Sequence, residues 1–231
     1  MVQLFENRVD AGRQLAERLA GYAGRPGVLV LGLPRGGVPV AFEVAVALGL
    51  PCDVFTAHKL GVPGHEELAM GAVASGDVCV MNRDIVSAFD VPDAEVTRMI
   101  AQTSEEIRQR ELRYRGNRPP VDVHGSTVIV VDDGIATGAT MRAAVTALRA
   151  QHAQRVVVAA PVAAFDSLPL ITREADEVVV LSMPDRFRAV GAWYREFPRL
   201  EDDEVRTLLE RAAEQLPEEA KIATHRRMHT G

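Results

Sequence analysis

The chain has 231 residues, of which 47% are hydrophobic and 25% are charged, and its formal net charge is −6. A chain of this length can bury one large core with a small appendage, and its acidic balance argues against broad nucleic-acid binding. It has no run of roughly 18 apolar residues that could span a membrane. Its first residues lack the apolar stretch of a secretory signal, so we expect a cytoplasmic protein. Cys52 and Cys79 stand apart in apolar contexts and are expected to pack as small hydrophobic side chains.

Apolar residues recur at helical spacing over residues 7–22, which predicts an N-terminal helix. A strand-type apolar run follows at 28–33. It leads into the turn Pro34-Arg35-Gly36-Gly37 and then into a helix at 38–48. These elements make a first strand-loop-helix unit.

A second strand is predicted at 53–60, and Lys59 stands near its end. The glycine and proline content of 61–67 predicts a mobile loop without fixed structure of its own. Two short apolar runs flank the turn sequence Ser75-Gly76-Asp77, which predicts a small hairpin over 70–82 that returns the chain to the core.

A long helix is predicted at 92–115, with one apolar stripe and a charged remainder. The stripe consists of Val96, Met99, Ile100, Thr103 and Ile107. A connector at 116–125 carries Pro119-Pro120 and leads to further strands and helices. The strands are expected at 128–131, 155–160 and 177–181, and the helices after residue 140 and at 166–174. This alternation predicts a mostly parallel sheet with helices on both faces and a ligand site outside the strand carboxyl ends.

The C-terminal part is less regular. Residues 183–197 carry an aromatic cluster and little periodicity, a charged helix is expected at about 202–215, and 217–231 are expected to be a disordered tail.

The most informative segment begins with four apolar residues at 128–131 and continues with the carboxylate pair Asp132 and Asp133. After them come Gly134, Ile135, Ala136, Thr137, Gly138, Ala139 and Thr140. The pair can accept hydrogen bonds from vicinal hydroxyls, and the backbone N–H groups of the turn at 137–140 can face an anion at a helix N-terminus. The segment therefore predicts binding of a sugar phosphate.

Residues 128–140 closely resemble the PRPP (phosphoribosyl pyrophosphate) loop of type I phosphoribosyltransferases. The resemblance implies that Asp132 and Asp133 hold the ribose 2′- and 3′-hydroxyls, and that 134–140 bind the 5′-phosphate. It also implies an α/β fold with a twisted, mostly parallel sheet, a small hood lobe and a flexible loop built as a β-hairpin. We expect 1–25 to belong to the hood, 26–181 to be the core and 182–216 to be a C-terminal hood segment with a helix.

The turn at 34–37 follows the first strand, so its position is that of the family's pyrophosphate loop, which often contains a cis peptide. Gly36 and Gly37 let the backbone approach an anion, and Arg35 can offer a fork of donors. The resemblance extends the pyrophosphate site to Lys59, although a lysine at a strand end can also be a solvated charge. The expected catalytic residues are thus Asp132, Asp133, Arg35 and Lys59.

The reaction implied by the resemblance is displacement at the anomeric carbon by a nitrogen nucleophile, with pyrophosphate leaving. We expect Mg²⁺ as cofactor, bound mainly through substrate oxygens and water, with Asp132 and Asp133 as further candidate ligands. The same two carboxylates would stabilise positive charge on the ribose ring. The expected partners are PRPP, a small-molecule acceptor and a second copy of the chain.

One position departs from the pattern. Where 6-oxopurine transferases carry an acidic residue just before the Thr-Gly pair, this chain has Ala136. The resemblance therefore does not supply a general base for a purine, and hypoxanthine or guanine is disfavoured as the acceptor. The acceptor pocket is expected in the hood, where Phe187, Trp193, Tyr194 and Phe197 could either stack on a flat base or form the core of the lobe. Residues 188–194 and the turn at 34–37 together resemble a bacterial family of predicted phosphoribosyltransferases.

Two alternative functions are less well supported. A non-catalytic regulator that senses PRPP or a nucleotide and binds RNA or a protein partner would keep the ribose phosphate cradle but has less use for Arg35 and Lys59. A dehydrogenase or NTPase is disfavoured because its glycine-rich signatures are missing. His58 and His65 could donate a proton, but an isolated histidine has several structural explanations.

Overall fold

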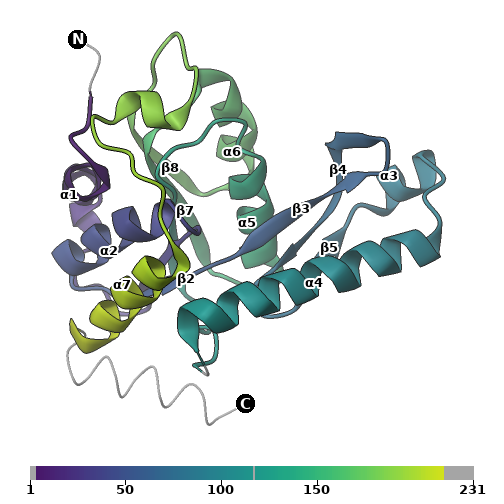
Figure 1. Ribbon diagram of the computed structural model, residues 1–231, viewed down its shortest axis with the longest axis horizontal. Coiled ribbons are helices and arrows are strands. Elements are labelled where there is room, and N and C mark those ends of the chain that lie inside the picture. The colour runs from purple at the N-terminus through teal and green to yellow at the C-terminus, as the bar shows by residue number, and fades with distance from the viewer. Residues whose placement is uncertain (1–3, 117, 216–231) are drawn as a thin grey trace.

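The computed structural model describes residues 4–116 and 118–215 (Figure 1). Its core is a five-stranded sheet in the order β2-β1-β6-β7-β8, and every neighbouring pair is parallel. The strands are β1 (Val28–Gly32), β2 (Cys52–Val54), β6 (Thr127–Val131), β7 (Arg155–Val162) and β8 (Glu177–Ser182). The predicted α/β class with a mostly parallel sheet is confirmed.

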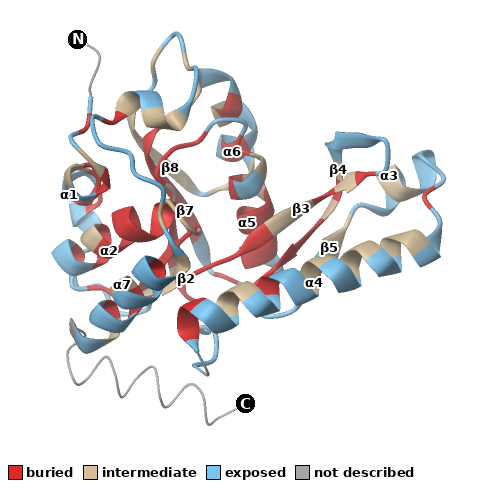
Figure 2. Cartoon of the chain, in the orientation of Figure 1, coloured by how far each residue is buried: buried red, intermediate tan, exposed pale blue. Residues whose placement is uncertain are grey.

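Helices cover both faces of this sheet because its strands are apolar on both sides. Val28 and Val30 pack beneath α1 (Arg8–Arg18) and α2 (Gly37–Leu48). Leu29 and Leu31 point the other way, into a cluster with α5 (Ala139–Ala150) and α6 (Leu168–Glu174). Short 3₁₀ turns lie at Ala20–Tyr22 and Phe165–Ser167. Figure 2 shows the buried central strands β1, β6 and β7 and the buried inner sides of these helices.

A second unit projects from the core as an arm, which comprises residues 57–115 (Figure 1). Its antiparallel sheet consists of β3 (Ala57–Val62), β4 (His65–Ala74) and β5 (Val78–Met81), followed by α3 (Arg83–Ala88) and α4 (Asp93–Arg115). Ile107 of α4 is buried against this sheet, and Val96, Met99 and Ile100 pack beside it. The predicted apolar stripe is therefore the inner face of α4, whose outer face is exposed (Figure 2).

Two predictions about the arm are wrong. The single strand expected at 53–60 is split, because β2 ends at Val54 in the parallel sheet and β3 begins at Ala57 in the arm. The switch is fixed by Thr56, which exchanges hydrogen bonds with Ser75: Thr56 N donates to Ser75 Oγ, and Ser75 N donates to the Thr56 carbonyl, each at 2.8 Å.

The loop without fixed structure expected at 61–67 is instead mostly strand, and it forms the tip of a β-hairpin. β3 and β4 continue to a tight turn at Pro63-Gly64, where Gly64 has φ +77°. The expected hairpin around Ser75-Gly76-Asp77 is present as the β4-β5 connection. Helix α3 follows it and was not predicted.

The C-terminal part returns over the core. Residues 183–200 are irregular apart from a 3₁₀ turn at Val190–Trp193, and α7 (Asp202–Gln215) buries Val205 and Leu209 against α2, β2 and Tyr114 of α4. The tail predicted at 217–231 lies outside the described residues, and the domain boundaries stay a prediction. No helix within the described chain is both long and apolar enough to cross a membrane.

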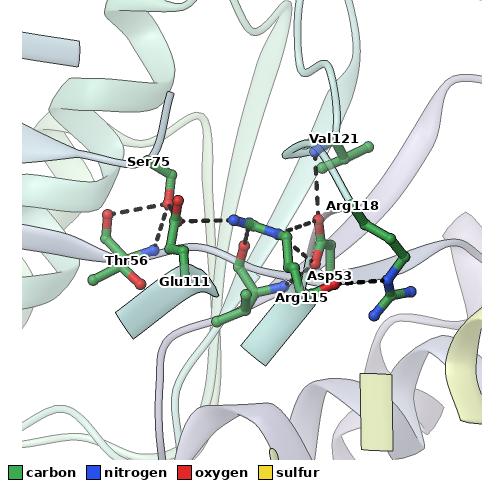
Figure 3. Close-up of polar contacts among 8 residues, drawn as sticks. Asp53, Thr56, Ser75, Glu111, Arg115, Arg118 and Val121 are labelled. Atoms are coloured by element: carbon green, nitrogen blue, oxygen red, sulfur yellow. Dashed lines mark hydrogen bonds and ion pairs between the residues drawn. The ribbon is translucent and has the colours of Figure 1, made fainter. Parts of the chain in front are cut away.

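Arg115, at the end of α4, ties the root of the arm to the core (Figure 3). Its Nε lies 3.0 and 2.9 Å from the two carboxylate oxygens of Asp53, its Nη1 lies 3.0 Å from Glu111 Oε1, and its Nη2 donates to the Val54 carbonyl. Glu111 also accepts from Ser75. Since Arg115 is only 6% exposed, this network holds a buried charge between β2, α4 and Ser75, which directly follows β4.

Arg115→Met should lower the free energy of unfolding by about 3–5 kcal/mol, because it leaves two shielded carboxylates without their cation. Urea denaturation followed by circular dichroism measures this. The matched control is Arg118→Met, since the exposed Arg118 makes one 3.3 Å hydrogen bond to a backbone carbonyl in the same region. Equal losses for the two variants would show that the network does not stabilise the arm.

Candidate active site

The segment at 132–140 leaves the end of β6 and is anchored before it opens to solvent. Ile135 is buried, its N–H donates to Val162 at 2.9 Å, and its carbonyl accepts from Ala164 at 2.8 Å. Gly134 lies beneath Val190, where a Cβ would come within 2.5 Å of the valine side chain. Beyond these anchors Ala136 and Thr137 are exposed, and Gly138, with φ +76°, caps α5. The backbone at 137–140 thus forms an open turn at a helix N-terminus.

The turn at 34–37 packs directly on the carboxylate pair. β1 and β6 are neighbours in the sheet, so their carboxyl ends deliver both segments to one place. A Cβ on Gly36 would lie 1.9 Å from Asp133 Oδ2, and one on Gly37 would lie 2.8 Å from Asp132 Cα. The peptide bond between Pro34 and Arg35 is cis. Segments almost a hundred residues apart are therefore in contact at the edge where the site was expected.

The carboxylate pair is largely shielded, and Arg8 of α1 is its counter-charge. Arg8 Nε lies 2.8 Å from Asp133 Oδ2, and the two side chains are 10% and 12% exposed. Burial and the nearby Asp133 charge raise the pKa of Asp132 well above its usual value. Burial also raises the pKa of Asp133, and the Arg8 guanidinium offsets part of that rise. Removing the charge of Asp133 would therefore ease ionisation of Asp132.

A stretch of the C-terminal part, residues 197–202, runs across the turn at 34–37; we call it the strap. Arg35 donates through Nη1 to the Leu200 carbonyl, and its Nε lies 2.8 Å from Asp202 Oδ1. Asp202 Oδ2 lies 3.1 Å from Arg113 Nη1 of α4. Beneath the strap is a cavity of about 420 Å³. It is lined by Arg8, Arg35, Gly36, Asp133, Phe197, Pro198, Arg199 and Leu200.

Lys59 lies on the arm and lines a different cavity. This groove, of about 840 Å³, runs between the open face of the arm sheet and α5, and it also touches Thr137, Ala139 and Arg142. Lys59 Nζ lies 3.2 Å from the Glu67 carbonyl and 3.7 Å from the exposed Glu67 carboxylate. The structure thus brings Lys59 near the turn at 137–140, but not into the cavity that Arg35 lines.

The aromatic residues of the C-terminal part form a small core with Phe5. Tyr194 is 5% exposed, its ring lies between those of Phe5 and Phe197, and its hydroxyl donates to the Asp133 carbonyl at 2.5 Å. Phe187 and Trp193 stack on each other with ring centroids 6.5 Å apart and are half-buried. Tyr194 therefore has a structural role, because its ring is buried and its hydroxyl is hydrogen-bonded. Phe187 and Trp193 remain partly exposed to solvent.

The two histidines lie away from the carboxylate pair. The His58 ring is 3.4 Å from Arg110 of α4, and burial together with this guanidinium lowers the pKa of His58. His65 contacts Phe89 at the far end of the arm. Both rings have structural partners, and neither lines the cavity or the groove.

Sequence reasoning missed Arg8 and Asp202. Arg8 stands 125 residues from its partner Asp133, and Asp202 stands more than 160 residues from Arg35, so no local spacing relates them. One signal was available for Arg8: it opens a helix, where a positive charge opposes the helix dipole.

A parallel sheet covered on both faces, with loops gathered at the carboxyl ends of β1 and β6, defines an open α/β protein, a class whose ligands generally bind at that edge. The chain belongs to the phosphoribosyl transferase domain family, whose model matches residues 2–181.

The chain is also similar to two individual proteins. The Mycobacterium tuberculosis protein Rv0571c, whose name assigns it to the phosphoribosyl transferases, is 45% identical over 221 residues, which cover 96% of this chain and 50% of that protein. The chain thus spans about half the length of this relative. The crystal structure of TT1426 from Thermus thermophilus is similar with a TM-score of 0.82 and 42% identity, over 90% of this chain and 98% of the other.

Gly36→Ala should abolish the arrangement of the pair, because the new methyl group would displace the Asp133 carboxylate from Arg8. The backbone at Gly36 is right-handed helical, so alanine is conformationally allowed and only the contact is changed. We expect a stability loss of about 1–3 kcal/mol and loss of ribose 5-phosphate binding in calorimetry. Gly21→Ala, where a Cβ meets nothing within 4 Å, is the control. Unchanged binding in Gly36→Ala would contradict the predicted role of this contact.

Proposed function

We propose that the protein is a Mg²⁺-dependent phosphoribosyltransferase that transfers the 5-phosphoribosyl group from PRPP to a small nitrogenous acceptor, a nucleobase or an amine, and releases pyrophosphate. The observation that carries the proposal is the contact of Gly36 and Gly37 with Asp132 and Asp133. It sets a pyrophosphate-type loop against a ribose-type carboxylate pair, as one PRPP molecule requires.

The neighbouring regions support the same ligand. The turn at 137–140 opens α5, where backbone N–H groups favour a phosphate. Arg35 lines the cavity beside Asp133 and can hold pyrophosphate, and Lys59 in the adjoining groove is proposed as a second cation for it. The 5′-phosphate, the ribose and the pyrophosphate would thus each have a binding region along one edge of the sheet.

The proposed reaction needs no nucleophilic side chain. The bond from the anomeric carbon to the pyrophosphate oxygen breaks, and that oxygen takes both electrons. A bond to the acceptor nitrogen forms from its lone pair, and the nitrogen then loses a proton. Asp132 and Asp133 accept hydrogen bonds from the ribose hydroxyls and stabilise the positive charge that develops on the ring. Arg35 stabilises the charge on the leaving pyrophosphate.

The residues present fit a Mg²⁺ ion that is held chiefly by its substrate. Among the described residues no group of three His, Cys, Asp or Glu side chains could hold a metal. Mg²⁺ is often bound by one or two protein carboxylates together with phosphate oxygens and water. Asp132 and Asp133 can supply these carboxylate ligands. When bound, the ion would neutralise pyrophosphate charge.

The acceptor site is proposed on the hood side, with Phe187 and Trp193 as the aromatic residues that keep some exposure. Tyr194 is left out of this proposal because its ring and hydroxyl are already engaged. The homodimer and the cytoplasmic location stay predictions.

The proposal predicts that the wild-type chain releases pyrophosphate from Mg²⁺-PRPP in the presence of its acceptor. A screen of nucleobases and small amines with a coupled pyrophosphate assay measures this.

Asp132→Asn combined with Asp133→Asn should lower PRPP affinity in calorimetry about a hundredfold, because hydrogen bonds to charged groups contribute roughly 1.5–3 kcal/mol each. PRPP binding without turnover of any acceptor would favour the regulator. Unchanged affinity in the double variant would contradict the ribose site.

Arg35 and Asp202 should have opposite effects on pyrophosphate. Arg35→Ala should weaken binding of PRPP and of pyrophosphate about tenfold, and binding of ribose 5-phosphate much less, because only the leaving group loses its cation. Asp202→Asn removes a carboxylate that competes for Arg35 and should strengthen pyrophosphate binding about two- to fivefold. Asp203→Asn is the control, since its side chain is 85% exposed and faces Arg206. Weaker binding in Asp202→Asn would contradict the competition.

A further inference from the structure

Arg8 occupies a position where an arginine side chain is energetically unfavourable. It is 8% exposed, so its charge is removed from water, and it is the first residue of α1, where the helix dipole disfavours a cation. Asn7 already caps this helix by accepting from Asp10 N, so α1 does not need Arg8 to begin. The position of Arg8 is therefore explained by its partners outside the helix.

Three contacts fix the Arg8 guanidinium. Nε donates to Asp133 Oδ2 at 2.8 Å, Nη1 donates to the Pro198 carbonyl at 2.8 Å, and the group lies 3.8 Å above the centre of the Phe197 ring. Two hydrogen bonds and one stacked face fix both the plane and the position of the group. Arg8 thus joins α1, the ribose-type carboxylate and the strap.

Asp133 depends on this partner more than Asp132 does. Its carboxylate lies against Gly36 on one side and Arg8 on the other. Its carbonyl is held by the Tyr194 hydroxyl, and Tyr194 in turn pairs with Phe5, just before α1. Without Arg8 the backbone would stay in place, and the carboxylate would lose the only cation that any described contact gives it.

We propose that Arg8 is a positioning residue for the ribose half of the site, which acts through Asp133 and not on the pyrophosphate. The inference rests on the proposed function. It makes the start of α1 and the beginning of the strap parts of the ribose site, although neither belongs to the two loops that carry the family resemblance.

The test compares PRPP with ribose 5-phosphate and inorganic pyrophosphate, each of which corresponds to one part of PRPP. Arg8→Met should weaken binding of ribose 5-phosphate and of Mg²⁺-PRPP about tenfold or more, and should change binding of inorganic pyrophosphate less than twofold. Arg8→Lys should recover part of the loss, because an ammonium restores the charge but cannot make all three contacts. Arg13→Met is the control: it lies on the same helix, its side chain is 69% exposed, and its partner is Glu43. Calorimetry on the full chain gives each affinity.

A double-variant cycle separates positioning from direct contact. If Arg8 acts through Asp133, then Arg8→Met should cause no further loss of ribose 5-phosphate affinity in an Asp133→Asn background. A further loss there, or an equal loss for pyrophosphate, would overturn the inference. If the Asp133→Asn variant binds ribose 5-phosphate too weakly to be measured, the inference is tested by the effect of Arg8→Met alone on ribose 5-phosphate and on pyrophosphate.

The inference and the proposed function fail in different ways. A wild-type chain that binds ribose 5-phosphate and PRPP, with an unaffected Arg8→Met variant, would overturn the inference alone. A wild-type chain that binds neither ligand would overturn the proposed function and the inference with it.

Discussion

The site depends on one steric constraint: the backbone at Gly36 lies so close to Asp133 that no side chain fits between them. The distance of 1.9 Å from an ideal Cβ to Asp133 Oδ2 leaves no room for even a methyl group. The contact follows from the sheet, because β1 and β6 are parallel neighbours in register and their loops must leave at the same edge. A glycine here is a condition for bringing a carboxylate pair and an anion-type loop together.

Because Asp132 and Asp133 are adjacent and largely shielded from water, the pair needs a positive charge nearby. Shielding two adjacent carboxylates is costly unless a cation faces them, and Arg8 supplies it from α1. Arg8 and Arg35 in turn donate to the Pro198 and Leu200 carbonyls of the strap. The strap is held at its far end by α7, whose Val205 and Leu209 are buried against the core. The C-terminal part is thus tied to the site by both charge and apolar packing.

The sequence was sufficient where structure follows from local patterns. Apolar runs predicted the parallel strands, and the rule that parallel strands share a carboxyl edge predicted that 34–37 and 132–140 would meet. It was insufficient at 53–67, where hydrogen bonds between Thr56 and Ser75 decide the change of sheet. Arg8 and Asp202 were missed for the same reason, since their partners are far along the chain. Lys59 was placed correctly on a strand, but that strand belongs to the arm, so it faces the groove and not the cavity of Arg35.

Under the proposed function, Ala136 bears on whether the acceptor nitrogen loses its proton before or after it attacks the anomeric carbon. Ala136 is exposed in the loop, and a methyl group cannot remove a proton. The histidines do not replace a base there, since His58 faces Arg110 and His65 lies at the far end of the arm. An acceptor that must be deprotonated before it attacks would lack a partner at these positions. An acceptor nitrogen with a free lone pair would not need one, because it can attack first and release its proton afterwards to water.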